Sequence, residues 1–506
     1  MNKIITHSIW LNDVDLPKGE PLTSDTACDL LVVGSGIAGL SSAYEASRCG
    51  AKVIVIDRGE LVGGMTARTT AHLASEIDDY YSELINVVGE EQARLYHESQ
   101  VAAINRIEAI CHEESIDADF KRVDAFLVAA EPSDQHDLEQ EYEACRKLGV
   151  DVDWSGDPPI PLPPGTNSLR FAQQGRFHPL KYCSGLAAAI QRRGGALHPM
   201  TPYIDHKEDD QGVTVKTENG ASIRANAVLF ATNSPVNDRR AIHTKQVPMR
   251  TYAIAGKVPA DSIPDALVWD TLEAYHYVRL QPAGDGKDWL IVGGEDHRTG
   301  TADDMAERFK RLESWTTQRF PMFSAEHHWS GQVMEPVDYL PYSGRDGSKR
   351  IYVHSGDSGE GMTNSVAGAL NFIALYRNDK ARFAELFDPA RKPVSRQSLG
   401  EYVKGQGAVV SNLGEYLGAG EVESVDQIPI GEGAIMRRGL AKHAVYRGED
   451  GTLLERSAVC THIGCIVHWN SFEKCWDCPC HGSQFQPDGT VINGPAVKPL
   501  AVVASD

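Results

Sequence analysis

The sequence predicts an α/β fold that ends in a small all-β domain. Near the N-terminus, an apolar run closes with a glycine-rich turn, and a helix-like segment and a second apolar run follow within residues 29–57. This order is typical of a strand–helix–strand unit in a parallel sheet. From Glu421 onward short strand-like runs alternate with turns, and residues 444–456 have the pattern of a β-hairpin. At 506 residues the chain exceeds one ordinary domain.

The first unit contains the fingerprint Gly34-Ser-Gly36-Ile-Ala-Gly39 between a strand and a helix. Gly34 permits the tight turn, Gly36 lets the backbone approach a pyrophosphate, and Gly39 lets the helix pack on the strand. The helix N-terminus then stabilises the phosphate charge. The second strand, Val53-Ile-Val-Ile-Asp57, ends in an acid that is positioned to bind ribose hydroxyls. These features predict a dinucleotide site.

The residues after the second strand favour FAD. Arg58-Gly59, Gly63-Gly64-Met65-Thr66, Arg68 and His72 resemble the loop under the isoalloxazine in the FAD-dependent D-amino-acid oxidase and glycine oxidase superfamily. Three later stretches, 227–235, 277–294 and 351–363, resemble that superfamily in the right order, so the resemblance covers about residues 25–385. It implies a Rossmann-like, glutathione-reductase-type α/β FAD-binding domain with an interleaved α+β substrate domain. The FAD contacts that it implies, besides those of the fingerprint and Asp57, are Arg58, Gly64, Met65, Thr66, Arg68, Ala231, Gly359, Gly361, Met362 and Thr363.

Two loops near the C-terminus carry metal-ligand residue types. Cys460-Thr-His462 and Cys478-Pro-Cys480-His481 supply two thiolates and two imidazoles. This is the ligand set of a Rieske 2Fe–2S centre, and zinc also binds Cys and His at short spacing. The loops, with Gly494-Pro495-Ala496 placed like a proline loop, resemble the Rieske proteins of cytochrome bc complexes.

The Rieske resemblance extends to individual residues. It implies that Cys460, His462, Cys478 and His481 bind the cluster and that Cys465 and Cys480 form a disulfide. Ser483 matches the serine that donates a hydrogen bond to sulfur, whereas Phe485 stands where the family has tyrosine. Because such hydrogen bonds raise the potential, we expect a potential below that of the respiratory proteins.

Domain boundaries follow from composition and from the order of these segments. We expect the FAD-binding domain in residues 1–94, 166–239 and 339–387, and the substrate domain in residues 95–165 and 240–338. A linker at 388–420 would precede the small all-β Rieske domain at 421–506.

The resemblance also implies an activity. The substrate would be an amine or amino acid that gives a hydride from the carbon next to nitrogen to FAD, and water would hydrolyse the resulting imine. Because the cluster accepts one electron at a time, we expect an enzyme that relays electrons through the cluster to an external acceptor. A protein is one candidate for this acceptor. The alternative is a redox-sensing or electron-transfer protein whose cluster lies outside the catalytic circuit.

The candidate substrate-side residues come from Tyr275-His-Tyr277-Val-Arg279. A strand period of two places Tyr275, Tyr277 and Arg279 on one face. By resemblance Arg279 would clamp a substrate carboxylate, and a structural ion pair in the sheet is the alternative.

Composition limits the partners. A net charge of −21 disfavours nucleic acid and anionic membranes. No apolar run approaches the roughly 20 residues that span a bilayer, and residues 1–27 lack a basic region followed by an apolar stretch. We therefore expect a cytoplasmic enzyme, and homo-oligomer formation stays open.

Overall fold

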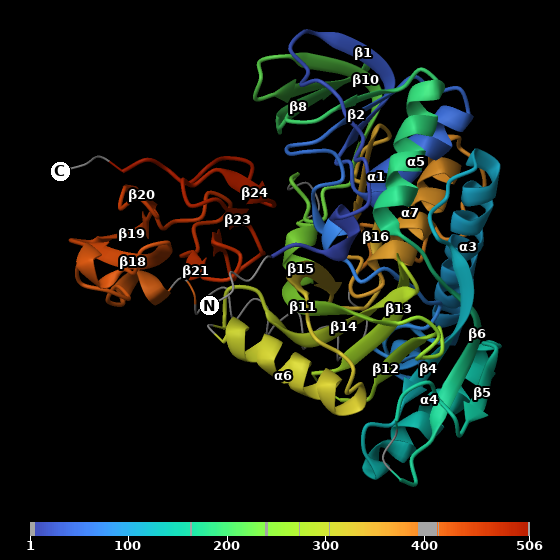
Figure 1. Cartoon of the computed structure of the whole chain (residues 1–506). Helices are drawn as coiled ribbons and strands as arrows, with labels where there is room; N and C mark the ends of the chain where they lie inside the picture. The colour runs from blue at the N-terminus through green and yellow to red at the C-terminus, as the bar shows by residue number, and fades with distance from the viewer. Residues whose placement is uncertain are drawn as a thin grey trace.

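The computed structural model describes residues 6–503 except 162–163, 238–240, 273, 303, 393–411 and 413. Most of the expected linker therefore lies outside the described residues. Two large sheets make up the first three quarters of the chain, and the C-terminal domain packs beside them, orange to red in Figure 1.

The first sheet holds the glycine fingerprint and has the order β16-β17-β10-β1-β2-β7. Along this order, each strand runs parallel to its neighbour except β16, which is antiparallel to β17. Its strands are β1 (Thr26–Val33), β2 (Val53–Ile56), β7 (Ala196–His198), β10 (Ser222–Phe230), β16 (Tyr342–Arg345) and β17 (Ile351–Ser355), and the hairpin β8 (Tyr203–Asp209) and β9 (Gly212–Thr217) joins at β10.

Side chains alternate across this sheet, as the pleat of a strand requires. Leu30 and Val32 of β1 pack in the core shared with the helices, whereas Leu31 and Val33 pack with the strands of the β8–β9 hairpin. Because both faces are covered, the strands are apolar throughout, as expected for a buried parallel sheet. The helices on one side are α1 (Ile37–Arg48), α3 (Glu90–Glu114), α5 (Pro179–Arg192) and α7 (Gly361–Tyr376) (Figure 1).

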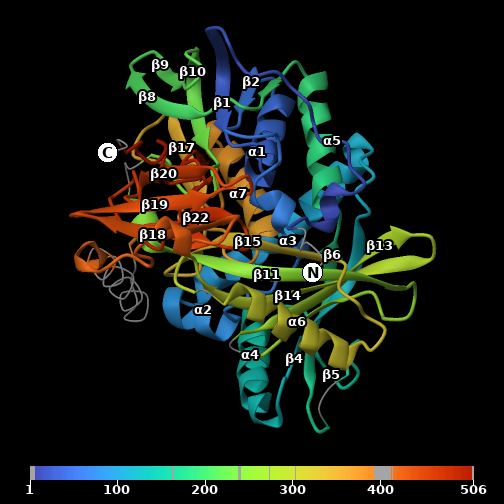
Figure 2. The same cartoon turned by 60° about the vertical axis from the view of Figure 1, so that its left-hand side comes forward.

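The second sheet has the order β15-β11-β14-β13-β12-β4-β6-β3, with β5 beside β6. Helix α6 (Met305–Arg319) covers it (Figure 2). Helices α2 (Tyr81–Val88) and α4 (Gln135–Leu148) pack at its end. The strands are β3 (His72–Leu73), β4 (Lys121–Val128), β5 (Val152–Ser155), β6 (Ser168–Arg176), β11 (Gln246–Pro259), β12 (Leu267–Asp270), β13 (His276–Gly284), β14 (Lys287–Arg298) and β15 (His327–Pro336).

Two strands of this sheet differ from the expected domain ranges, which place residues 1–94 and 166–239 in the FAD-binding domain. Strand β6 pairs with β4 over most of its length, and β3 then pairs with β6 at the sheet edge. The chain thus crosses between the two sheets inside those ranges. A short crossing has no local sequence pattern, which is why the fingerprint motifs could not locate it.

The C-terminal domain consists of two small antiparallel sheets. The predicted hairpin is β19–β20, and its turn contains Gly448 and Gly451. The cysteine and histidine loops flank the sheet of β21 to β24. The core of the C-terminal domain includes the buried rings of Trp476 and Phe485. The strands are β18 (Glu432–Arg438), β19 (Ala441–Arg447), β20 (Leu453–Ser457), β21 (His468–Asn470), β22 (Cys475–Asp477), β23 (Gln484–Phe485) and β24 (Val491–Asn493).

This domain is docked on the second sheet and on the edge of the first. Arg68 pairs with Glu473 at 2.9 Å, and the ring centroids of Phe309 and Phe472 lie 4.6 Å apart. Both views show the domain beside β11 and β15 (Figures 1 and 2). Among the described helices, none has the length and apolar character needed to cross a bilayer.

Candidate functional site

The glycine fingerprint forms the tight turn that its spacing predicts. Gly34 has φ +108°, and a Cβ there would lie 2.2 Å from the carbonyl oxygen of Ala231. A Cβ on Gly39 would lie 1.9 Å from the carbonyl oxygen of Gly34, so only glycine lets α1 pack this close to β1. Gly36 is the N-cap of α1, and the first residues of that helix line a cavity. The positive end of the helix therefore faces the space where a pyrophosphate would bind.

Asp57 is held at the end of β2 with its carboxylate against the turn. One carboxylate oxygen accepts hydrogen bonds from the Ser35 backbone N–H at 2.7 Å and from its hydroxyl at 2.6 Å. The other accepts from the Gly59 N–H at 3.0 Å. Asp57 lines the same cavity, as a ribose-binding acid must.

The cavity has a volume of about 830 Å³ and runs from this turn to the second sheet. The predicted cofactor residues that line it are Gly34, Gly36, Asp57, Arg58, Gly64, Met65, Thr66, Arg68, Ala231, Gly359, Gly361 and Met362. Gly39 supports the turn from behind. Thr363 does not reach the cavity: it is buried in α7, where its hydroxyl donates to the Glu360 carbonyl.

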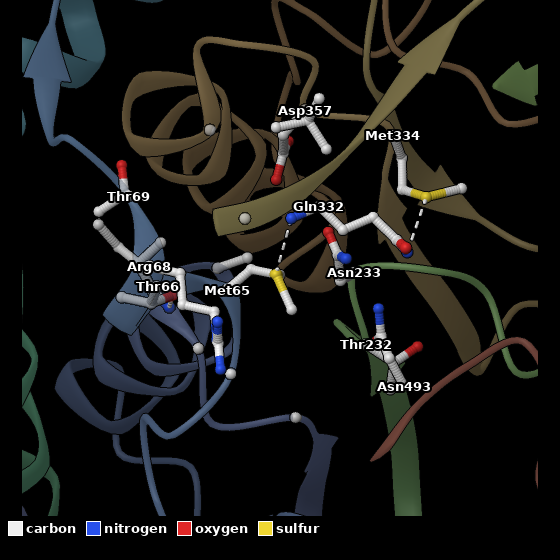
Figure 3. A pocket seen from close by; sticks show the side chains of 18 of the residues that line it. Met65, Thr66, Arg68, Thr69, Thr232, Asn233, Gln332, Met334, Asp357 and Asn493 are labelled. Carbon is white, nitrogen blue, oxygen red and sulfur yellow. Dashed lines mark hydrogen bonds between the residues drawn. The ribbon is translucent and has the colours of Figure 1, made fainter. Parts of the chain in front are cut away.

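The lining suits a large polar ligand such as FAD. Figure 3 shows Gln332 between the sulfur atoms of Met65 and Met334, with Asn233 and Asn493 nearby. The Nδ2 groups of Asn233 and Asn493 have no hydrogen-bond partner among the described residues. Buried amide donors are normally satisfied, so these two groups are open to ligand oxygens.

Tyr275 and Tyr277 form part of the cavity end made by the second sheet, as their strand period predicts. We call this region the sheet end; its other walls come from Thr251, Asp296 and Glu335. The Tyr277 hydroxyl is hydrogen-bonded to the Thr251 hydroxyl at 2.6 Å. Its ring lies over Gly293, where a Cβ would come within 2.1 Å of ring carbon.

Arg279 lies outside the cavity lining, so its position does not favour the substrate clamp that the resemblance implies. Its side chain is fully buried and does not line the cavity. One guanidinium nitrogen donates to the carbonyls of Ala71 and Phe177, and another to the Gln281 side chain. The strand period correctly gave its face, but Arg279 lies farther along β13 than the tyrosines, under the chain that enters β3.

The sheet end is acidic, which sequence reasoning missed. Glu76, Asp78, Asp296, Glu335 and Glu360 all line the cavity. Burial raises the pKa of Asp296 to about 7, and repulsion from Asp78 adds to this shift. Burial, followed by repulsion from other carboxylates, also raises the pKa of both Glu335 and Glu360. Glu76 and Asp78 share the loop before α2, whereas Asp296, Glu335 and Glu360 come from three other parts of the chain, so no spacing in the sequence relates all five.

The C-terminal loops bring together the predicted cluster ligands. Cys460, Cys478 and His481 are buried, and the ring centroids of His462 and His481 lie 5.0 Å apart. Cys465 and Cys480 form a disulfide, which leaves two thiols and two imidazoles as ligands. The His481 Nδ1 atom has no hydrogen-bond partner among the described residues, so it is available to a metal. These residues fit a 2Fe–2S cluster with two cysteine and two histidine ligands.

Ser483 occupies the supporting position that the sequence predicts. The pKa of the Cys460 thiol is lowered, chiefly by a hydrogen bond with Cys478 and further by one with Ser483. The Ser483 hydroxyl also accepts from the Ala496 N–H at 3.0 Å, which ties it to the proline loop. Phe485 is fully buried and offers no hydroxyl.

The cluster loops of the C-terminal domain pack directly against the part of the chain that forms the two large sheets. His243 lies between β10 and β11. The centroid of its ring is 4.6 Å from that of His462 and 4.9 Å from that of His481. The segment around β24 of the same domain forms one wall of the large cavity, and the Arg58 side chain donates to the Val491 carbonyl. No motif signalled this arrangement, because it joins residues hundreds of positions apart.

Comparison with known proteins agrees with this geometry. The family model "FAD dependent oxidoreductase" matches residues 29–373, and "Rieske [2Fe-2S] domain" matches residues 419–504. The Bacillus subtilis protein YhfW, whose name describes a Rieske 2Fe-2S iron-sulfur protein, is 30% identical over 98% of this chain and 97% of its own length. Gamma-glutamylputrescine oxidoreductase of Escherichia coli is 24% identical over 72% of this chain and 87% of its own.

Solved structures share the fold of a large part of this chain. The crystal structure of glycine oxidase from Geobacillus kaustophilus superposes with a TM-score of 0.61 at 18% identity, over 72% of this chain and 99% of that chain.

Proposed function

This chain belongs to the FAD dependent oxidoreductase family and carries a C-terminal Rieske [2Fe-2S] domain, and on that basis we propose that it oxidises an amine or amino acid and passes the electrons singly through its own cluster to an external acceptor. The observation that carries the proposal is the shared cavity. Residues around β24 of the Rieske domain form one wall of the space that the glycine fingerprint and Asp57 also line. A bound FAD and the cluster would therefore be held by parts of the chain that contact each other.

The cofactors supply the redox chemistry: bound FAD accepts two electrons as a hydride, and the cluster accepts one. The protein binds, orients and encloses. The turn at Gly34 and the N-terminus of α1 would hold the pyrophosphate, and Asp57 the ribose. Tyr275 and Tyr277 present a wall at the sheet end against which a substrate can be positioned.

The names of related proteins support a nitrogen-containing substrate. One relative is a gamma-glutamylputrescine oxidoreductase, and one structure with this fold is a glycine oxidase. Each name describes a compound with an amine group. A hydride from the carbon next to that nitrogen is the shared chemistry on which the proposal rests.

Transfer within one chain is supported by the docking of the Rieske domain. The ligand histidines are packed against His243 of the flavin part. Arg58 and Arg68, which follow β2, also each contact the Rieske domain. These contacts would hold a bound FAD and the cluster at a constant separation, on which the rate of electron transfer depends.

A purified sample tests the proposal directly. We expect a flavin absorption spectrum and, after dithionite, the anisotropic EPR signal of a Rieske cluster. Anaerobic addition of amines and amino acids should then bleach the flavin with at least one of them. A protein that holds zinc in place of iron, or that no such compound bleaches, would contradict the proposal. Bleaching that never reaches the cluster would instead favour a cluster outside the catalytic circuit.

A further inference from the structure

The charge at the sheet end of the cavity has one sign. Glu76 and Asp78 come from the loop before α2, Asp296 from β14, Glu335 from β15 and Glu360 from the residue before α7. Each lines the cavity. Tyr275 lies among them, and its hydroxyl donates to Asp78 at 3.2 Å.

The cationic side chains near this cavity are occupied by other groups. Among the described residues the lining contains two arginines and no lysine. Arg68 is paired with Glu473 and also donates to the Ser330 carbonyl, and Arg58 donates to Val491. Arg279 donates to backbone carbonyls outside the cavity. A substrate carboxylate at the sheet end would therefore meet several carboxylates and no available cation.

Several of these acids have oxygens that await a donor. Glu360 is 7% exposed and Glu76 is 2% exposed, and one carboxylate oxygen of each has no hydrogen-bond partner among the described residues. One oxygen of Asp296 is also without a partner in that part of the chain. A buried carboxylate oxygen that lacks a donor is costly, and an ammonium group offers three N–H donors and a compensating charge.

A metal ion is a poorer fit than an organic cation. Among the described residues, three ligand atoms come within 4.8 Å of one another only at Cys465, Cys478 and Cys480 and at Glu76, Glu141 and Cys145. In the second group, Glu141 already accepts from the backbone of Tyr81 and Ser82. Asp78, Asp296 and Glu335 do not converge on one point, so they suit charges spread along a molecule.

From these observations we propose that the substrate is an amine with a second cationic group and no carboxylate, a diamine or polyamine, and that Asp296 and Glu335 determine this specificity. The inference rests on the function proposed above and narrows its substrate class. One nitrogen would be oxidised, while Asp296, Glu335 and Asp78, which are spread around the sheet end, offer anionic partners to the other cationic nitrogens of the substrate. The rings of Tyr275 and Tyr277, whose centroids are 5.4 Å apart, would contact the carbon chain and the cation.

The test uses the full-length holoprotein and anaerobic flavin bleaching. The probes are 1,4-diaminobutane and spermidine, with butylamine, glycine and L-proline as comparisons. We expect the Kd from the bleaching rates to be at least tenfold lower for 1,4-diaminobutane or spermidine than for butylamine, and no bleaching by the two amino acids. Butylamine has the same carbon chain and lacks only the second charge.

Variants then locate the effect. Asp296→Asn and Glu335→Gln should each raise the Kd of the better diamine or polyamine tenfold or more and change that of butylamine by less than twofold. Asp288→Asn is the matched control, because Asp288 lies on the same strand as Asp296 but outside the cavity lining. This substitution should change neither the Kd of the diamine or polyamine nor that of butylamine. FAD content and Tm of each variant show that it is folded.

Each outcome either supports or overturns the proposed specificity for a diamine or polyamine. Bleaching by glycine or L-proline, or equal Kd values for the diamine and butylamine, would overturn this inference and leave the proposed oxidation of an amine or amino acid intact. A failure of all amines and amino acids to bleach the flavin would overturn both. Unchanged diamine Kd values in folded Asp296→Asn and Glu335→Gln proteins would remove these residues from the specificity site.

Discussion

Arg250 of β11 and Asp477 of β22 form a buried ion pair between the second sheet and the Rieske domain. One guanidinium nitrogen lies 2.9 Å and 3.1 Å from the two carboxylate oxygens, and each side chain is 3% exposed. Asp477 also accepts hydrogen bonds from Asn470 and Gln484, and it directly precedes the ligand Cys478. The pair therefore fixes the cluster loop on the flavin part.

Removing one partner of this pair should loosen the docked domain. Arg250→Met leaves the Asp477 carboxylate buried without its cation, which typically costs about 3–5 kcal/mol. We expect a lower Tm and slower reduction of the cluster by substrate, with the rate of flavin bleaching unchanged. The double variant Arg250→Met, Asp477→Leu should recover much of the Tm. Arg382→Met, at an exposed ion pair with Glu98, is the control and should change the stability by less than about 1 kcal/mol.

Ser483 and Phe485 should set the cluster potential. Ser483→Ala removes a hydrogen bond to the Cys460 sulfur and should lower the midpoint, whereas Phe485→Tyr can add one and should raise it. A difference of about 1 kcal/mol between the oxidation states corresponds to roughly 40 mV for a one-electron couple. An EPR-monitored redox titration measures both. A midpoint that Phe485→Tyr leaves unchanged would count against the assigned role of this position.

The turn at Gly34 should be essential for FAD. Gly34→Ala places a Cβ on a residue with φ +108° and against the Ala231 carbonyl, a strain of roughly 1–3 kcal/mol or more. We expect protein purified with little FAD and an affinity reduced about tenfold or more. Gly156→Ala is the control, because no atom lies within 4 Å of its Cβ position and it lies outside the cavity lining. Equal FAD content in both variants would contradict the assigned role of the turn.

Arg279 should matter for stability and leave substrate binding unchanged. Arg279→Met leaves the carbonyls of Ala71 and Phe177 without a donor, and each unsatisfied buried group costs about 1–3 kcal/mol. We expect a marked fall in the Tm measured by calorimetry and an unchanged substrate Kd at a temperature where the variant is folded. A stable variant with weakened substrate binding would restore the clamp interpretation.

Asp296 should make stability depend on pH. Its pKa rises from an ordinary value of 3.8 to about 7 in the folded protein. Between these values the folded protein retains a proton that the unfolded chain releases, so the contribution of Asp296 to stability falls as the pH rises. The Tm advantage of Asp296→Asn over the native protein should therefore grow from about pH 4 to about pH 7 and then level off. Repulsion from Asp78 and Glu295 favours this shift, and Arg308 opposes it. A constant difference in Tm across this range would refute it.

Features encoded within short segments were predictable from the sequence. The turn at Gly34, the acid at Asp57 and the loops with Cys460 and Cys478 each depend on neighbours a few residues away, because local backbone geometry determines them. Strand period also gave the correct face for Tyr275, Tyr277 and Arg279. Neither strand period nor the resemblance that implied a carboxylate clamp could show that the cavity lining ends before Arg279 of β13.

Features made by tertiary packing were not predictable. Arg250 and Asp477 are 227 positions apart in sequence, and nothing near either residue indicates its partner. Asp78, Asp296 and Glu335 line one cavity only because a loop and two strands surround it. Single acids on strands or in loops are common, so their placement around one cavity becomes visible only in the folded chain.

Rapid freeze-quench EPR after anaerobic mixing with a reducing amine tests the internal electron relay most directly. With FAD bound and the cluster oxidised, the account predicts that the Rieske signal grows after the flavin bleaches, at a rate independent of protein concentration. A flavin that bleaches while the cluster stays oxidised, or a cluster whose reduction rate increases with protein concentration, would contradict transfer within one chain.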